Sequence, residues 1–163
     1  MTLAVTILFA ITTLGIAYQD FKYRAIHVLL LILLLGVGIA DAVLAERPLQ
    51  DLLFSFGFVV TVLSLMMIYL RLKTGYWLNP LKEHLGLGDV LFFIAVIPLF
   101  NQHGYLWFFI SGLVVCLVVY KLLKSVIGED SIPLAGLLSA YLLGLKILEA
   151  QSSFSMFNLN LMA

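Results

Sequence analysis

Six apolar segments, each near the length of a membrane-spanning helix, constrain the fold of this chain more than any other feature. A spanning helix needs about 20 mostly apolar residues, because each residue adds about 1.5 Å against a hydrocarbon core of roughly 30 Å. Polar and turn-forming residues separate the segments. They cover Leu3–Gln19, Val28–Ala45, Leu52–Leu70, Leu87–Phe100, Tyr105–Leu123 and Ile132–Leu148. We therefore expect an all-α, polytopic membrane protein with six transmembrane helices.

The composition agrees with a protein built for the bilayer. Apolar and aromatic residues make up 63% of the 163 residues, and charged residues only 11%, unlike the mix of a soluble domain. Nine basic residues balance nine acidic ones, so no nucleic-acid-binding surface is indicated. We expect one six-helix domain over residues 1–150, in contact with membrane lipid. A short tail over residues 151–163 is expected to be interfacial or disordered. Nothing in the sequence indicates an oligomeric state.

The placement of the basic residues predicts the orientation, because lysine and arginine accumulate in short cytoplasmic loops. Only Arg47 and Lys146 fall on one side of a six-helix arrangement. The loops after the first, third and fifth segments carry the others, which are Lys22, Arg24, Arg71, Lys73, Lys82, Lys121 and Lys124. These loops should face the cytoplasm and both chain ends should face away from it. Asp20, which ends the first segment, and Asp89, which begins the fourth, then lie at one membrane face.

Asp89 is the acidic residue whose position is hardest to explain by solvation. It lies inside the apolar run from Leu85 to Phe93, and a helix that begins there is short and leaves its first residues recessed in the protein. An ionised carboxylate in hydrocarbon costs at least about 2.5 kcal/mol, so a functional role is the default interpretation. The remaining acidic residues at helix ends are expected to be solvated among the headgroups; these are Asp41, Glu46, Asp51 and Glu149.

Gly86 and Gly88 precede Asp89 and remove side chains on either side of Leu87. They permit backbone conformations that other residues avoid and the close approach of another chain, as a protease acting on an extended peptide requires. Tight packing between helices is the alternative explanation for such paired glycines.

Asp20 and Asp89 supply the two carboxyl groups that an aspartic peptidase uses as its catalytic dyad. Two carboxylates about 3 Å apart do not both ionise easily and so hold one proton between them. The ionised member takes a proton from water while the protonated member polarises the scissile carbonyl, and the roles reverse as the intermediate collapses. Which aspartate carries the proton stays open, and the pair is described as a unit.

Three motifs resemble those of the type IV prepilin peptidases. Asp20-Phe21-Lys22-Tyr23-Arg24-Ala25-Ile26 resembles their first motif, and Gly86-Leu87-Gly88-Asp89 resembles the second, the GxGD signature. The segment Ile132-Pro133-Leu134-Ala135-Gly136 is similar to the proline-containing segment that often opens their last helix. The resemblance covers the whole chain and implies a GxGD aspartyl protease architecture in the inner (cytoplasmic) membrane, with its site facing the cytoplasm. It implies a partner, a pilin-like precursor with a hydrophobic N-terminal helix, from which a short basic leader is removed.

The chain also departs from the family pattern. His27 and Val28 stand where the family commonly has Pro and then Asn or Asp, and Leu91 stands where it often has Lys. These departures bear on substrate preference and leave the carboxylates in place. Larger members carry an N-terminal cytosolic insertion with paired cysteines and a methyltransferase activity. This chain has a single cysteine, Cys116, and no such insertion, so we expect cleavage without N-methylation.

Further site residues are expected around the dyad. Gly86, Gly88, Lys22, Arg24 and Pro133 are candidates for binding the substrate. The stretch Arg71–Leu85 is the longest break between segments, and we hypothesise that it covers the site and gates entry. His27, His84 and His103 form no ligand pattern, so neither a metal nor an organic cofactor is expected. The aromatic group that contains Tyr105, Trp107, Phe108 and Phe109 is interpreted as an interfacial belt.

Two other activities fit parts of the pattern. A presenilin-like or signal-peptide-peptidase-like intramembrane protease also uses GxGD, although those proteins are longer and lack the basic pattern after Asp20. A non-enzymatic, ion-coupled transporter would bind cations at Asp20 and Asp89, with its sites near the bilayer midplane rather than at one face. A catalytically inactive assembly protein is disfavoured by the intact pair of aspartates.

Overall fold

A computed structural model describes residues 3–74, 86–127, 133–151 and 157 of the chain. Most of the proposed Arg71–Leu85 cover, together with Lys82 and His84, therefore lies outside the described residues. The same is true of the segment before Pro133 and of almost all of the tail after Gln151.

The described residues form an all-helical protein, which confirms the all-α part of the predicted fold class. Four of the helices are long and apolar enough to cross a membrane, and this identifies a membrane protein. They are α1 (Leu3–Tyr23), α3 (Leu49–Thr74), α6 (Gln102–Ile127) and α7 (Leu134–Gln151). The other elements are α2 (Val28–Leu44), α5 (Leu87–Val96) and the 3₁₀ turn η1 (Ile97–Leu99).

Two of the six predicted helices, α2 and α5, are shorter than the four candidate spans, and a short helix was expected at α5. The α2 helix has 17 residues and the continuous element of α5 and η1 covers only Leu87–Leu99. Pro98 explains the short α5, because proline has no backbone N–H and its ring clashes with the carbonyl four residues earlier. The backbone tightens into η1 around Pro98 and becomes extended at Phe100.

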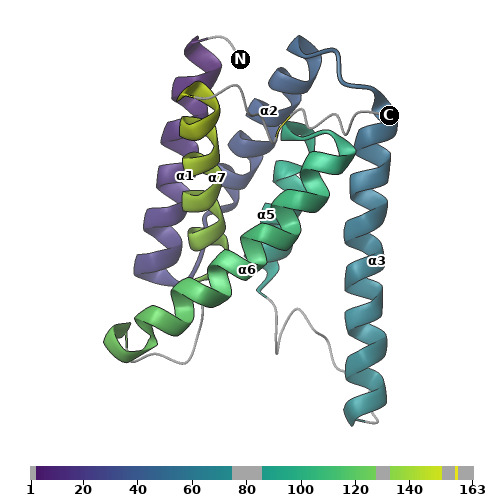
Figure 1. Cartoon of the computed structure of the whole chain (residues 1–163), viewed down its shortest axis with the longest axis vertical. Helices are drawn as coiled ribbons and strands as arrows, with labels where there is room; N and C mark the ends of the chain where they lie inside the picture. Colours follow the sequence, from purple (N-terminus) through teal and green to yellow (C-terminus); the bar gives the residue numbers. More distant parts are fainter. Residues whose placement is uncertain (1–2, 75–85, 128–132, 152–156, 158–163) are drawn as a thin grey trace.

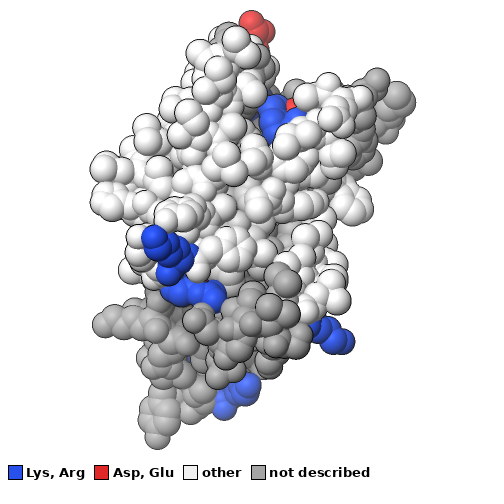
Figure 2. Space-filling model, turned by 90° about the vertical axis from the view of Figure 1, so that its left-hand side faces the viewer, with Lys and Arg blue, Asp and Glu red and all other residues white. Residues whose placement is uncertain are grey.

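The helices run alternately up and down, which brings one end of each to a shared end of the bundle (Figure 1). The α1 helix packs along α7 and also against α2, α2 packs on α5 and η1, and α6 packs on α7 and α3. In the view of Figure 1, α1, α3 and α6 finish at the lower end, where α5 and α7 begin. Most Lys and Arg side chains on the face shown in Figure 2 gather toward that end, and a largely uncharged white surface lies above them.

Stacked aromatic rings fill the core near η1. The Phe100 ring stacks on Phe108 at 4.8 Å and on Phe157 at 4.7 Å between centroids, and the Tyr105 hydroxyl donates to the Phe93 carbonyl at 3.0 Å. Phe157 is the one described residue beyond Gln151, and it is buried.

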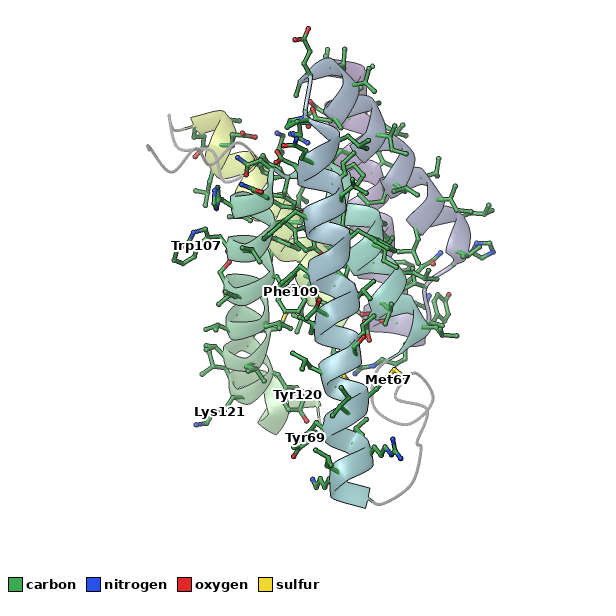
Figure 3. All side chains as sticks on the ribbon, turned by 90° about the vertical axis from the view of Figure 1, so that its right-hand side faces the viewer. Met67, Tyr69, Trp107, Phe109, Tyr120 and Lys121 are labelled. Atoms are coloured by element: carbon green, nitrogen blue, oxygen red, sulfur yellow. The ribbon has the colours of Figure 1, made fainter. Side chains whose placement is uncertain are left out.

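The interpretation of the aromatic group as an interfacial belt is wrong for two of its members. Tyr105 and Phe108 are fully buried. Trp107 points away from the bundle, whereas Phe109 lies between α6 and α3 (Figure 3). Four neighbouring residues of a helix cover its whole circumference, so only some of them can face lipid.

A buried ion pair lies at the opposite end of α2 from the α1–α2 connection. Arg47 donates to Asp41 at 2.9 Å, and each side chain is only 5% exposed; Arg47 also donates to the Pro98 carbonyl. Glu46 takes a left-handed conformation (φ 51°), which turns the chain back so that Arg47 reaches α2. The expectation that Asp41 is solvated at the surface is therefore wrong.

Candidate active site

Asp20 lies in the last turn of α1 and is only 7% exposed. The helix ends just beyond it, where Arg24 adopts a left-handed conformation (φ 52°) and its N–H donates to the Asp20 carbonyl at 3.1 Å. The next helix is started by His27, whose ring accepts from Leu29 N–H at 3.4 Å. The His27 N–H in turn donates to the Gln19 side chain at 2.8 Å. These bonds fix the short connection that follows Asp20.

Asp89 lies in the first turn of α5, and its position depends on the two glycines before it. Gly86 caps the helix in an extended conformation, and its carbonyl accepts from Asp89 N–H at 3.1 Å. A Cβ atom at Gly86 would lie 3.2 Å from Asp89 Oδ2, and one at Gly88 would lie 3.3 Å from Ile26 Cδ1. The absence of side chains thus makes room for the Asp89 carboxyl group and for the α1–α2 connection.

The beginning of α7 joins the two aspartates. Gly136 N–H donates to Asp20 Oδ2 at 2.6 Å, and Ala135 N–H donates to Asp89 Oδ1 at 3.0 Å. The first amides of a helix have no acceptor within the helix, and they carry the positive end of its dipole. Consecutive amides therefore hold one oxygen of each carboxyl group, and the carboxyl groups from α1 and α5 lie side by side.

Pro133 and Gly136 shape this junction from the α7 side. Pro133 has no N–H to satisfy, is buried, and accepts from Leu137 N–H at 3.0 Å to close the first turn. A Cβ atom at Gly136 would lie 3.0 Å from Asp20 Oδ2 and 3.1 Å from Asp20 Cβ. Only glycine lets the backbone of α7 approach Asp20 this closely.

A pocket of about 290 Å³ opens beside the two carboxyl groups, with room for several water molecules. Arg24, four residues after Asp20, lines the same pocket and brings a positive charge to it. The pocket is lined by residues of the α1–α2 connection and of the GxGD segment, namely Asp20, Arg24, Ala25, Ile26, Gly86, Leu87, Gly88 and Asp89.

The candidate binding residues fall into two groups. Arg24, Gly86 and Gly88 line the pocket. Lys22 lies outside its lining: the ammonium group donates to the Tyr18 hydroxyl at 2.8 Å and sits 5.1 Å from the centre of the Tyr23 ring. Pro133 directly precedes α7 and is not among the residues that line the pocket.

The sequence reasoning missed the amides of Ala135 and Gly136 as partners of the carboxyl groups. The proline-containing segment pointed to this region, but backbone donors have no side-chain signature. Within the described ranges, no group of three or more His, Cys, Asp or Glu residues could hold a metal ion. Cys116 is buried in α6.

Two neighbouring carboxyl groups that accept hydrogen bonds from one helix N-terminus, beside a pocket with room for several water molecules, have the chemistry needed to share a proton and activate water. No protein-family model matches the chain, and comparisons with curated proteins and with solved structures found no match either.

Proposed function

We propose that this chain is a membrane-embedded aspartic endopeptidase of the GxGD architecture, with Asp20 and Asp89 as its catalytic residues. Its proposed reaction is removal of the short basic leader from a type IV pilin-like precursor at the cytoplasmic face of the inner membrane, without N-methylation. All six helices would then belong to the membrane domain, with α2 and α5 as short, tilted or recessed members.

One observation carries this proposal: acidic side chains from two separate helices share one pocket and are held by consecutive amides of a third helix. Asp20 and Asp89 are far apart in sequence, and burying two carboxyl groups together is unfavourable unless donors compensate. A chain that needed only to span the membrane would place apolar residues there. The arrangement is the one that general acid–base hydrolysis by a carboxyl pair requires.

In the proposed reaction, the ionised carboxyl group accepts a proton from a pocket water as the water oxygen bonds to the scissile carbonyl carbon. The protonated carboxyl group donates its proton to the carbonyl oxygen. The tetrahedral intermediate then collapses: the C–N bond breaks, the leaving nitrogen takes the proton that the first carboxyl group accepted from water, and a hydroxyl of the intermediate returns a proton to the second carboxyl group as the new carboxylic acid forms. The α7 amides hold the carboxyl groups in place throughout, so less reorganisation is needed as charge moves.

The substrate segment has to be extended at the cut, because a helix shields its own carbonyls. Extended backbone at membrane depth is tolerated only where it lines a protein cavity. The pocket beside Gly86 and Gly88 provides such a cavity. A hydrophobic helix after the cut and a polar leader before it would place the scissile bond at this end of the bundle.

The position of the carboxyl groups favours a protease over an ion-coupled transporter. Asp20 is in the last turn of the 21-residue α1, together with the basic Lys22, and this marks a membrane face, whereas the ion site of such a transporter is expected near the bilayer midplane. Both carboxyl groups already accept backbone hydrogen bonds.

Co-expression with candidate pilin-like precursors tests the proposal. Asp20→Asn and Asp89→Asn keep a side-chain oxygen that can accept the α7 amide bond but remove the titratable carboxyl group. We expect leader loss with the natural chain, none with either variant, and normal leader loss with the control Asp51→Asn, which changes an acidic residue of α3 outside the pocket. Processing that survives either pocket substitution would contradict the dyad.

A further inference from the structure

An apolar groove between α2 and α5 leads away from the pocket that holds Asp20 and Asp89. It has a volume of about 100 Å³ and no polar residue in its lining. The α2 side contributes Val28, Leu31, Ile32 and Leu35, and the α5 side contributes Leu91, Ile94 and Ala95.

The groove continues the walls of the pocket on both sides. Ile26 lines the pocket and Val28, two residues later, lines the groove. On α5, Leu87 lines the pocket and Leu91, one helical turn further, lines the groove. Leu87 is 61% exposed and Val28 is 50% exposed, so the place where pocket and groove meet is open.

We propose that this α2–α5 groove holds the hydrophobic helix of the precursor while its scissile bond lies in the pocket. The inference rests on the proposed function and adds the path of the substrate. A helix that follows the cut begins beside Asp89 and needs an apolar surface within its first turn. The α2–α5 groove provides that surface, and Leu91 contributes an uncharged, apolar side chain to its lining. Recognition is then by apolar side chains packed into a groove, as for other helix-in-groove complexes.

A second apolar cavity, of about 160 Å³, lies across α5, between α3, α6 and the start of α7. Val90 and Phe93 separate it from the α2 side. It shares no lining residue with the catalytic pocket, whereas the α2–α5 groove extends both walls of that pocket. The second cavity therefore serves as the competing location in the test.

Photo-crosslinking in the full chain locates the precursor helix. A photoreactive residue is placed at Ile32 or Leu91 in the Asp89→Asn background, which prevents turnover. Matched positions are Leu33, an exposed neighbour on α2 that does not line the groove, and Met66, which lines the second cavity. We expect precursor adducts at Ile32 and Leu91, several-fold above those at Leu33 and Met66. Adducts mainly at Met66, or equal yields at Ile32 and Leu33, would overturn the proposal that the precursor helix binds in the α2–α5 groove.

Filling the groove gives a second, kinetic measurement. Ile32→Trp is expected to raise KM and lower kcat/KM for the precursor by about tenfold, whereas Leu33→Trp leaves both unchanged. Equal kinetics for the two variants would contradict binding of the precursor helix in the groove while leaving the proposed peptidase activity intact. A natural chain that fails to cleave the precursor would instead contradict the proposed function itself, so the two failures are distinguishable.

Discussion

The Asp20 carboxyl group accepts a hydrogen bond of 2.6 Å from Gly136 N–H, across 116 positions of sequence. This contact joins the end of α1 to the beginning of α7, and the neighbouring Ala135 amide does the same for Asp89. The two carboxyl groups of the proposed catalytic pair therefore also cap the beginning of α7. Substitutions at this junction can separate the two roles.

Gly136→Ala tests how closely α7 must approach Asp20. The new Cβ atom would lie 3.0 Å from Asp20 Oδ2 and 3.1 Å from Asp20 Cβ, so α7 or α1 has to shift. We expect a loss of about 1–3 kcal/mol in the free energy of unfolding, as for other overpacked sites, and a strong loss of peptidase activity. Denaturation in detergent and a cleavage assay measure the two effects.

Gly144→Ala is the matched control in the same helix, because nothing lies within 4 Å of its added Cβ. Alanine favours a helix over glycine by about 0.5–1 kcal/mol, so this variant should be as stable as the natural chain or more so. If both variants behaved alike, close contact at Gly136 would not be the reason for its glycine.

Two replacements of Asp20 distinguish its role in capping α7 from its proposed role in cleavage. Asp20→Ala removes the acceptor of the Gly136 amide and should lower the free energy of unfolding by about 1–3 kcal/mol, the cost of an unsatisfied buried donor. Asp20→Asn keeps an acceptor and should lose much less stability while losing all cleavage. An Asp20→Asn chain that unfolded as easily as Asp20→Ala would show that the negative charge, rather than the acceptor, holds α7.

Arg24 combines a pocket-lining side chain with a left-handed backbone conformation. Asparagine tolerates that conformation better than most residues, so Arg24→Asn removes the charge without adding backbone strain. We expect a lower rate of cleavage, because the cation beside Asp20 is gone. Arg24→Lys should restore most of the rate. Full activity of Arg24→Asn in a steady-state assay would exclude an electrostatic role.

The buried Asp41–Arg47 pair provides a prediction far from the pocket. Arg47→Met leaves the Asp41 carboxyl group buried without its cation and should cost about 3–5 kcal/mol in the free energy of unfolding. The double variant Asp41→Leu with Arg47→Met removes both charges and should recover most of this loss. Chemical denaturation of the three chains tests it, and a double variant no more stable than Arg47→Met would contradict a compensated pair.

The sequence was sufficient to place Asp20 and Asp89 at one end of the bundle. Apolar segment lengths and alternation of helix direction fix which helix ends meet, and the basic residues mark the same end. Helix lengths were less predictable: hydropathy extended the fourth segment through Pro98, where the missing N–H ends α5. Asp41 looked like a surface residue because nothing in its local sequence shows that Arg47 folds back onto it.

The amide contacts at Ala135 and Gly136 could not be predicted from the sequence, for a physical reason. They depend on which helix N-terminus lies against the carboxyl groups, and that is decided by packing between helices rather than by local propensity. In the sequence, only Gly136 indicates this packing, because it has no side chain at the point where α7 approaches Asp20 most closely. His27 likewise shows its capping role only in the folded structure, where its ring accepts a hydrogen bond from Leu29 N–H.

The most direct test of the central claim is cleavage of a purified pilin-like precursor by the purified full chain in detergent, followed by mass spectrometry. We predict two fragments whose masses sum to that of the precursor plus one water, an unmethylated N-terminus on the mature fragment, and no product with Asp20→Asn or Asp89→Asn. Cleavage at the same bond by either variant would contradict it.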